Sequence, residues 1–298
     1  MLADLPFLGA GLVYQHALHA EIMAHRDGID FLEVPTDQFL RHGPEWGEEL
    51  EELKHAFKTV AHSLYLSLGD AKGPHVAYLD RVRPFLDDLG PAWYSDHFDM
   101  GNVPDSEFGQ YFHGMQVPFT QEQAEIFRSN MAFVTNRLQR PLLAENIFYK
   151  FVFPMPSSLP EPVFIGEALK GSDCGLLLDL TNLDINAMNF GFDANEWLAA
   201  APLEHTVEIH VAGGELRTEG SWKGKWADTH NHPVPDVVWR MVEHVVSQTP
   251  VRAITLEWDQ NYPPMSVLME QLSIARGILA QSTAAPRAPV AAPPGSGG

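Results

Sequence analysis

The sequence predicts an α/β protein made of a single (β/α)8 barrel of the TIM type. Three observations predict this fold. The length of 298 residues suits one large α/β barrel, which typically needs about 250 residues. Short apolar runs alternate with helical patterns along the chain, as in parallel α/β proteins. Polar side chains that can bind metal recur where the apolar runs end, which is where barrel enzymes carry their active sites.

Eight short apolar runs are the predicted strands. Several of them are continuous rather than alternating, which is typical of parallel strands covered on both faces. In chain order they span residues 8–14, 31–34, 59–64, 93–95, 142–144, 175–178, 207–209 and 253–256. Eight is also the number of strands that closes a TIM barrel.

Helical patterns lie between these runs. The clearest begins at Thr120, where Thr-Gln-Glu-Gln forms a capping box and apolar residues follow at alternating spacings of 3 and 4 as far as Leu138. Another begins near Pro264, because proline favours a first helical turn, and its apolar stripe is expected to close the barrel. Further helices are predicted over residues 48–57, 76–89, 162–169 and 235–246.

We expect the barrel to occupy residues 1–281 and a disordered tail to follow. Residues 282–298 read STAAPRAPVAAPPGSGG, a Pro/Ala/Gly-rich segment without aromatic residues or periodicity. The first residues carry no basic region ahead of an apolar stretch, so no signal peptide is expected. No stretch approaches the ~20 apolar residues that span a bilayer. The expected location is therefore the cytoplasm, without a membrane partner.

Composition narrows the function classes. The chain has 39 acidic and 19 basic residues, a formal charge of −20. A surface this acidic repels phosphate backbones, which disfavours nucleic acid as a partner. The single cysteine, Cys174, excludes an intramolecular disulfide and a thiolate zinc site. We expect Cys174 to be a buried, small hydrophobic residue.

Polar residues with metal-binding atoms end the third to eighth predicted strands. In a TIM barrel these positions converge on one pocket at the catalytic face. They are His62, His97, Glu145, Asp179, His210 and Glu257. Asn182 follows within the same segment as Asp179, and Asp228 and His230 follow in the polar segment Ala-Asp-Thr-His-Asn-His.

Such a gathering of carboxylates and imidazoles predicts a metal centre. Buried carboxylates are costly and like charges together cost more, unless cations are shared between them. Mixed imidazole and carboxylate ligands without cysteine suit Fe, Mn, Zn or Co and disfavour Ca and Mg. Taken singly, each histidine is more often a hydrogen-bonded core residue, and Asn182 fits a helix cap as well as a ligand. We expect Asp96 and Asp259 to act behind the ligands, with Asp96 orienting a neighbouring histidine.

Seven motifs resemble those of a known enzyme family. They are AHSLYLSLG from Ala61, YSDH, LLAEN, GLLLDLTNLDINAMNFGFD from Gly175, EIHVAG, ADTH and LEWD. In this order they are similar to the multinuclear non-haem iron-dependent oxidative enzymes. That family includes the methanobactin-biosynthesis oxidase and was formerly catalogued as a domain of unknown function. The resemblance runs from about Gly9 to Ile278, and it implies a xylose isomerase-like barrel.

The resemblance also implies a cofactor and a reaction. The cofactor is two or three iron ions of mixed Fe(II)/Fe(III) valence, with dioxygen as co-substrate. Such enzymes oxidise residues, often cysteine, in ribosomally synthesised precursor peptides, and they work with a separate peptide-recognition protein. The family's pattern implies a first iron on Glu145, Asp179, His210 and Glu257, a second on Glu145, His62 and His97, and a third on Asn182, Asp228 and His230.

Three departures from the family's pattern lie outside the expected ligands. Gly213-Gly214 stands where many members have a histidine after the Ala-Gly, the second strand ends EVPTDQF instead of Glu-Asn, and Asn189-Phe190-Gly191 replaces Asn-His-Gly. They are expected to line the mouth, so they bear on substrate identity. Two other functions remain open: a non-redox metalloenzyme on the same barrel (a sugar isomerase or phosphodiesterase) and a metal-storage protein.

Overall fold

The computed structural model of the chain describes residues 2–101, 115–150, 152 and 156–284. Its centre is a closed barrel of eight parallel strands in the order β1-β10-β7-β6-β5-β4-β3-β2. Each predicted strand overlaps one of these eight, so the predicted barrel is confirmed. The strands are β1 (Gly9–Val13), β2 (Phe31–Pro35), β3 (Lys58–His62), β4 (Tyr94–His97), β5 (Leu142–Glu145), β6 (Gly175–Asp179), β7 (Thr206–Val211) and β10 (Ala253–Leu256).

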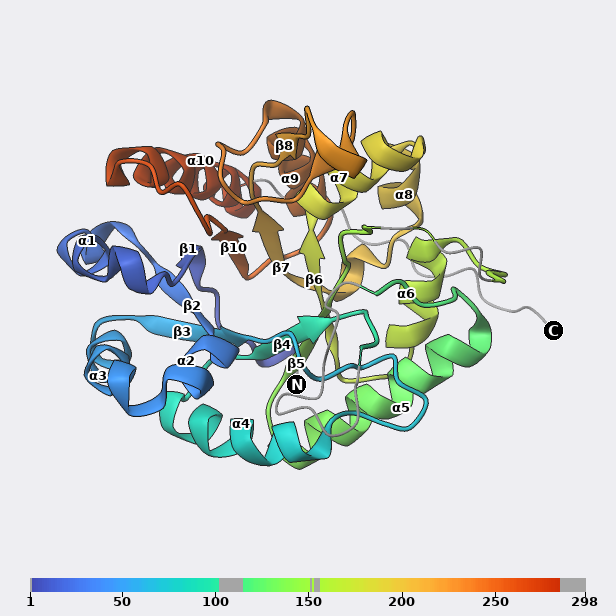
Figure 1. Cartoon of the computed structure of the whole chain (residues 1–298), viewed down its shortest axis with the longest axis horizontal. Coiled ribbons are helices and arrows are strands. Elements are labelled where there is room, and N and C mark those ends of the chain that lie inside the picture. The colour runs from blue at the N-terminus through green and yellow to red at the C-terminus, as the bar shows by residue number, and fades with distance from the viewer. Residues whose placement is uncertain (1, 102–114, 151, 153–155, 285–298) are drawn as a thin grey trace.

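Helices surround the strands (Figure 1). They are α1 (His19–Ala24), α2 (Thr36–His42), α3 (Gly47–Ala56), α4 (Val76–Leu89), α5 (Gln121–Leu138), α6 (Glu161–Leu169), α7 (Leu180–Phe190), α8 (Ala194–Ala200), α9 (Asp236–Gln248) and α10 (Met265–Ala284). Six correspond to predicted helices, while α1, α2, α7 and α8 were not predicted. Short 3-10 turns are η1 (Leu2–Asp4), η2 (His16–Leu18), η3 (Arg26–Gly28), η4 (Gly43–Trp46), η5 (Leu203–His205) and η6 (Gly220–Trp222).

The two helices with the strongest sequence signals form as predicted. The Thr120 hydroxyl accepts a hydrogen bond from the backbone N–H of Gln123 at 3.1 Å and so caps α5. Helix α10 packs against β1 and β10, the two strands that close the barrel. It runs to Ala284, three residues past residue 281, where the barrel was predicted to end, and residues 285–298 lie outside the described residues. No helix in the described ranges is long and apolar enough to cross a membrane.

The barrel interior changes from apolar to polar along the strands. Because side chains at positions i and i+2 of a strand share a face, Val60 and His62 point the same way, as do Leu143 and Glu145. The side chains that face the barrel interior are apolar at the amino-terminal ends of the strands and polar at the carboxyl ends. The apolar floor is one buried cluster, made of Leu5, Leu8, Phe31, Val60, Trp93, Leu143, Leu177, Val207 and Ala253.

Two short strands stand apart from the barrel. Strands β8 (Glu215–Leu216) and β9 (Trp226–Ala227) pair antiparallel as a hairpin after β7. The side chain of Asn189 on α7 holds this hairpin, because its Nδ2 donates to the carbonyl of Trp226 at 2.8 Å and its Oδ1 accepts from the Trp226 amide at 2.9 Å. The hairpin is therefore fixed beside the carboxyl ends of β6 and β7.

Candidate metal centre

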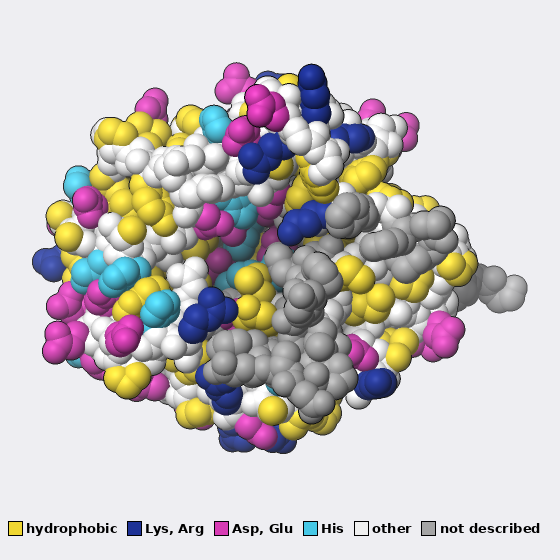
Figure 2. Space-filling view, viewed as in Figure 1, with side chains coloured by type: hydrophobic (Ala, Val, Ile, Leu, Met, Phe, Trp, Pro, Cys, Tyr) yellow, Lys and Arg dark blue, Asp and Glu magenta, His cyan; other side chains and the backbone are white. Residues whose placement is uncertain are grey.

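The predicted ligands gather at the carboxyl ends of the barrel strands. A cavity of about 460 Å³ opens there. In Figure 2 it is a recess in which histidine and acidic side chains meet. His210 is completely buried next to Glu145 and Glu257. The other eight predicted ligands line the cavity, and they are His62, His97, Glu145, Asp179, Asn182, Asp228, His230 and Glu257.

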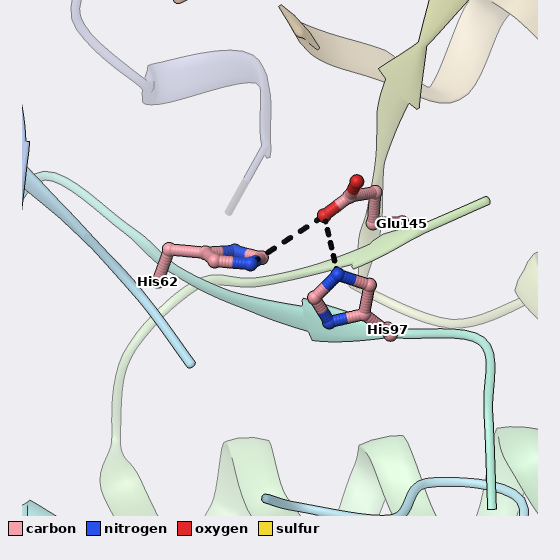
Figure 3. A group of neighbouring side chains, drawn as sticks. All are labelled: His62, His97 and Glu145. Atoms are coloured by element: carbon pink, nitrogen blue, oxygen red, sulfur yellow. Dashed lines mark ion pairs between the residues drawn. The ribbon is translucent and has the colours of Figure 1, made fainter. Parts of the chain in front are cut away.

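One group of donors comes from three consecutive strands. His62 ends β3, His97 ends β4 and Glu145 ends β5, and His97 is paired in register with Glu145. The Oε2 atom of Glu145 lies 3.5 Å from Nε2 of His62 and 3.2 Å from Nε2 of His97 (Figure 3). The three donor atoms are close enough together to hold one ion.

A second group uses the other oxygen of the same glutamate. Glu145 Oε1 lies 4.0 Å from Nδ1 of His210, and this nitrogen is 3.3 Å from Oε1 of Glu257. Donor atoms of Glu145, Asp179 and His210 again lie within 4.8 Å of one another. Glu145 therefore belongs to both groups, with one carboxylate oxygen toward each.

His230 and Asp228 form the outer part of the site. His230 Nε2 lies 2.7 Å from Oδ1 of Asp228 and 3.7 Å from Oε2 of Glu257. The backbone of His230 has a φ of 46°, in the left-handed region that non-glycine residues adopt at a cost. Asn182, in the first turn of α7, donates its backbone N–H to Asp179 at 2.7 Å and places its side-chain nitrogen 3.5 Å from Glu145. Asp179 is thus the residue that caps α7, and Asn182 lies at the site without capping the helix.

Several buried atoms of these residues make no hydrogen bond in the described part of the chain. An unsatisfied buried polar atom costs about 1–3 kcal/mol, and such atoms are uncommon in folded proteins. Most of these are acceptors, so cations between them would remove the cost. A donor set of nitrogen and oxygen without sulfur fits a borderline transition metal. The atoms are Glu145 Oε2, Asp179 Oδ2, Asn182 Oδ1, His210 Nδ1 and Glu257 Oε2.

Burial and crowding perturb the acid–base properties of the site. Burial raises the pKa of Glu145 well above its usual range, and the pKa of Asp179 is raised by burial and by the nearby Glu257 and Asp228 carboxylates. Burial works to lower the pKa of His210, but the carboxylates of Glu33 and Glu257 outweigh it and raise this pKa well above its ordinary value. Without cations the cluster therefore keeps protons between its carboxylates and imidazoles.

The two residues expected behind the ligands differ in what they contact. Asp259 Oδ2 lies 2.8 Å from Nδ1 of His230, and its Oδ1 accepts from Nε2 of Gln15 at 2.9 Å. Asp96 accepts from the backbone N–H of His97 at 2.7 Å, whereas its Oδ1 is 3.7 Å from the ring nitrogen Nδ1 of His97. Asp259 is therefore within hydrogen-bond distance of the His230 ring. Asp96 instead binds the backbone N–H of His97, and its distance to the His97 ring is beyond hydrogen-bond distance.

Glu33 was not among the site residues predicted from the sequence. This glutamate lies on β2, is 1% exposed, and has its Oε2 atom 2.9 Å from Nε2 of His210. Burial raises the pKa of Glu33 to about 7, against the opposing effect of His210. One signal was available: a carboxylate inside the apolar run Phe-Leu-Glu-Val-Pro faces the core and must find a partner there.

The structure leaves no room for a side chain at Gly214, which follows the Ala-Gly of the His-x-Ala-Gly segment. A Cβ atom on Gly214 would lie 2.6 Å from Cδ1 of Ile185 and 2.8 Å from the carbonyl oxygen of Ala227 in β9. The hairpin and α7 therefore fill the space that a side chain would need.

Gly214→Ala is expected to destabilise the protein by about 1–3 kcal/mol, because a backbone carbonyl cannot yield as a flexible side chain does. Differential scanning calorimetry would show a lower Tm. Gly277→Ala in α10 is the matched control, since nothing lies within 4 Å of its added Cβ, and alanine should raise the Tm slightly. Equal Tm values for the two variants would contradict this account of the packing.

Comparisons with known proteins identify the family of the chain. A family model described as RiPP precursor modification enzyme MbnB/TglH/ChrH matches residues 9–280. A UPF0276 protein of Vibrio vulnificus is 31% identical over 280 residues, 93% of each chain. One of Caulobacter vibrioides is 32% identical over 273 residues, 91% of this chain and 94% of the relative.

Solved structures are similar in fold. Endonuclease IV from Thermus thermophilus aligns with a TM-score of 0.55 at 15% identity, over 92% of this chain and 99% of the other. A xylose isomerase-like TIM barrel protein from Mycobacterium smegmatis aligns with a TM-score of 0.56 at 13% identity, over 95% and 99%. The xylose isomerase-like barrel and the family predicted from the motifs are thus confirmed. The chain belongs to the RiPP precursor modification enzymes of the MbnB/TglH/ChrH family.

Proposed function

We propose that this protein is a multinuclear iron oxidase that uses dioxygen to oxidise a residue of a ribosomally synthesised precursor peptide. Cysteine is the favoured target residue. The family supports the class of substrate. The observation that carries the proposal is the position of Glu145, whose two oxygens face two separate donor groups. A carboxylate so placed suits a pair of ions held close together.

The nine proposed ligands are assigned to three iron ions. Glu145 would be shared by two irons, the first of which would also be held by Asp179, His210 and Glu257, and the second by His62 and His97. A third iron would be held by Asn182, Asp228 and His230. Iron that changes between its ferrous and ferric states supplies the redox chemistry with dioxygen that zinc lacks. Five of these side chains, those of Glu145, Asp179, Asn182, His210 and Glu257, present a buried atom that makes no hydrogen bond to described residues, which supports ligand roles.

The size of the cavity supports a substrate peptide that inserts one side chain at a time into the site. Its volume of about 460 Å³ is within the range of pockets for small ligands and cannot enclose a folded peptide. The cavity is also lined by the exposed amide side chains of Gln38 and Gln260, which can hydrogen-bond to a peptide backbone. The rest of a precursor peptide would lie outside the barrel, where a separate recognition protein would hold it.

The proposal predicts a coloured, iron-containing protein that consumes dioxygen only when a precursor peptide is present. Anaerobically purified protein would be examined by metal analysis and Mössbauer spectroscopy. The protein would then be mixed with oxygen and the peptide encoded beside its gene. Mass spectrometry would measure the mass of the peptide product. Peptide oxidation should be several-fold faster with the recognition protein than without it. A colourless zinc protein that hydrolyses a phosphodiester or isomerises a sugar would refute the proposal.

A further inference from the structure

The two ring nitrogens of His210 face different surroundings. Nδ1 points to the metal-ligand side, 3.3 Å from Glu257 and 4.0 Å from Glu145, and makes no hydrogen bond to the described residues. Nε2 lies 2.9 Å from Oε2 of Glu33, which also lines the cavity. The imidazole ring is completely buried, so water does not compete for either nitrogen.

A second carboxylate lies near Nε2 but is already engaged. Glu208 Oε1 is 3.9 Å from Nε2 of His210, beyond hydrogen-bond distance. Its two oxygens accept hydrogen bonds from Nε1 of Trp93 at 2.7 Å and from the hydroxyl of Thr255 at 2.5 Å. Glu33 is thus the carboxylate within hydrogen-bond distance of Nε2.

We propose that Glu33 is a positioning residue that keeps the hydrogen of His210 on Nε2, so that the ring presents the lone pair of Nδ1 to the metal. A neutral imidazole carries one N–H and one lone pair, and the hydrogen bond at one nitrogen decides which atom is the ligand. A carboxylate also makes the opposite nitrogen more basic and fixes the plane of the ring. This inference rests on the metal centre of the proposed function but not on its oxidation chemistry.

The placement of Glu33 suits this role. It is held on the inward face of β2, which pairs with β1 and β3, and the strand gives it little freedom to leave His210. His210 lies on β7, which is separated from β2 by β1 and β10 in the closed barrel. The hydrogen bond therefore crosses the barrel interior and ties the ring to a rigid support.

The test uses zinc as a diamagnetic probe on the full chain labelled with 15N-histidine. When zinc is bound, long-range 1H–15N NMR should show His210 with hydrogen on Nε2 and a metal-shifted Nδ1. Glu33→Ala should lose the fixed Nε2 hydrogen and weaken zinc binding about 10–100-fold, as losses of such partners do. Chelator competition would measure the affinity.

Glu33→Gln keeps the shape of the side chain, so it tests the idea if Glu33→Ala fails to fold. It should keep the Nε2 hydrogen through its amide oxygen, with a smaller loss of affinity. Glu208→Gln is the matched control and should leave both the His210 signals and the affinity unchanged. Unchanged affinity and an unchanged Nε2 hydrogen in Glu33→Ala would overturn the proposal, as would zinc bound at Nε2. Zinc bound at Nδ1 without peptide oxidation by the iron form would refute the proposed function alone.

Discussion

Glu145→Ala is expected to lose most of the bound metal and all peptide oxidation. Its two oxygens face the His62–His97 pair and the His210 group, so one substitution removes a ligand from both. It also removes negative charge from between two cations, whose mutual repulsion is strong at short range. Metal analysis of the purified variant, beside circular dichroism to show that it is folded, would measure the effect.

The comparison variant for Glu145→Ala changes only the outer part of the site, Asp228 and His230. Asp228→Ala combined with His230→Ala should keep about two irons per chain, because neither side chain belongs to the two donor groups that share Glu145. Full iron content in Glu145→Ala would rule out the bridge. Loss of all iron from the double variant would show that the ions bind cooperatively or that the ligands are divided differently.

Trp93→Ala is expected to cause the largest loss of stability. Trp93 is completely buried in the apolar floor of the barrel, and its Nε1 donates to the buried Glu208. Removing the indole leaves a cavity, at a cost of about 3–5 kcal/mol. Leaving Glu208 short of a donor adds about 1–3 kcal/mol. The sum is a large part of the roughly 5–15 kcal/mol by which domains are stable, so the denaturant midpoint should fall steeply or the variant should not fold.

Trp93→Phe separates the two contributions. Phenylalanine keeps most of the apolar volume but has no N–H for Glu208, so the loss should be well under that of alanine. Urea unfolding followed by far-UV circular dichroism would give both values. A phenylalanine variant as unstable as the alanine variant would show that the hydrogen bond, and not the filling of the floor, determines the stability of this end of the barrel.

The sequence predicted the barrel because its strands are apolar runs of the right length, and their carboxyl ends carried the polar residues that meet in the fold. Helix α7 was missed since most of it is buried, polar residues such as Asn182 and Asn186 included, which removes the amphipathic pattern that reveals a surface helix. Glu33 was missed because its partner, His210, is 177 positions away in sequence. A contact across the barrel interior leaves no local pattern.

The strand that completes the barrel is also the last to be made. Strand β10 pairs with both β1 and β7 and is followed directly by Glu257. Synthesis proceeds from the N-terminus, so a growing chain has the His62–His97–Glu145 group long before it has Glu257. A nascent chain can therefore offer a partial chelate while the barrel is still open. The complete set of proposed ligands can therefore come together only after β10 has been made and has paired with β1 and β7.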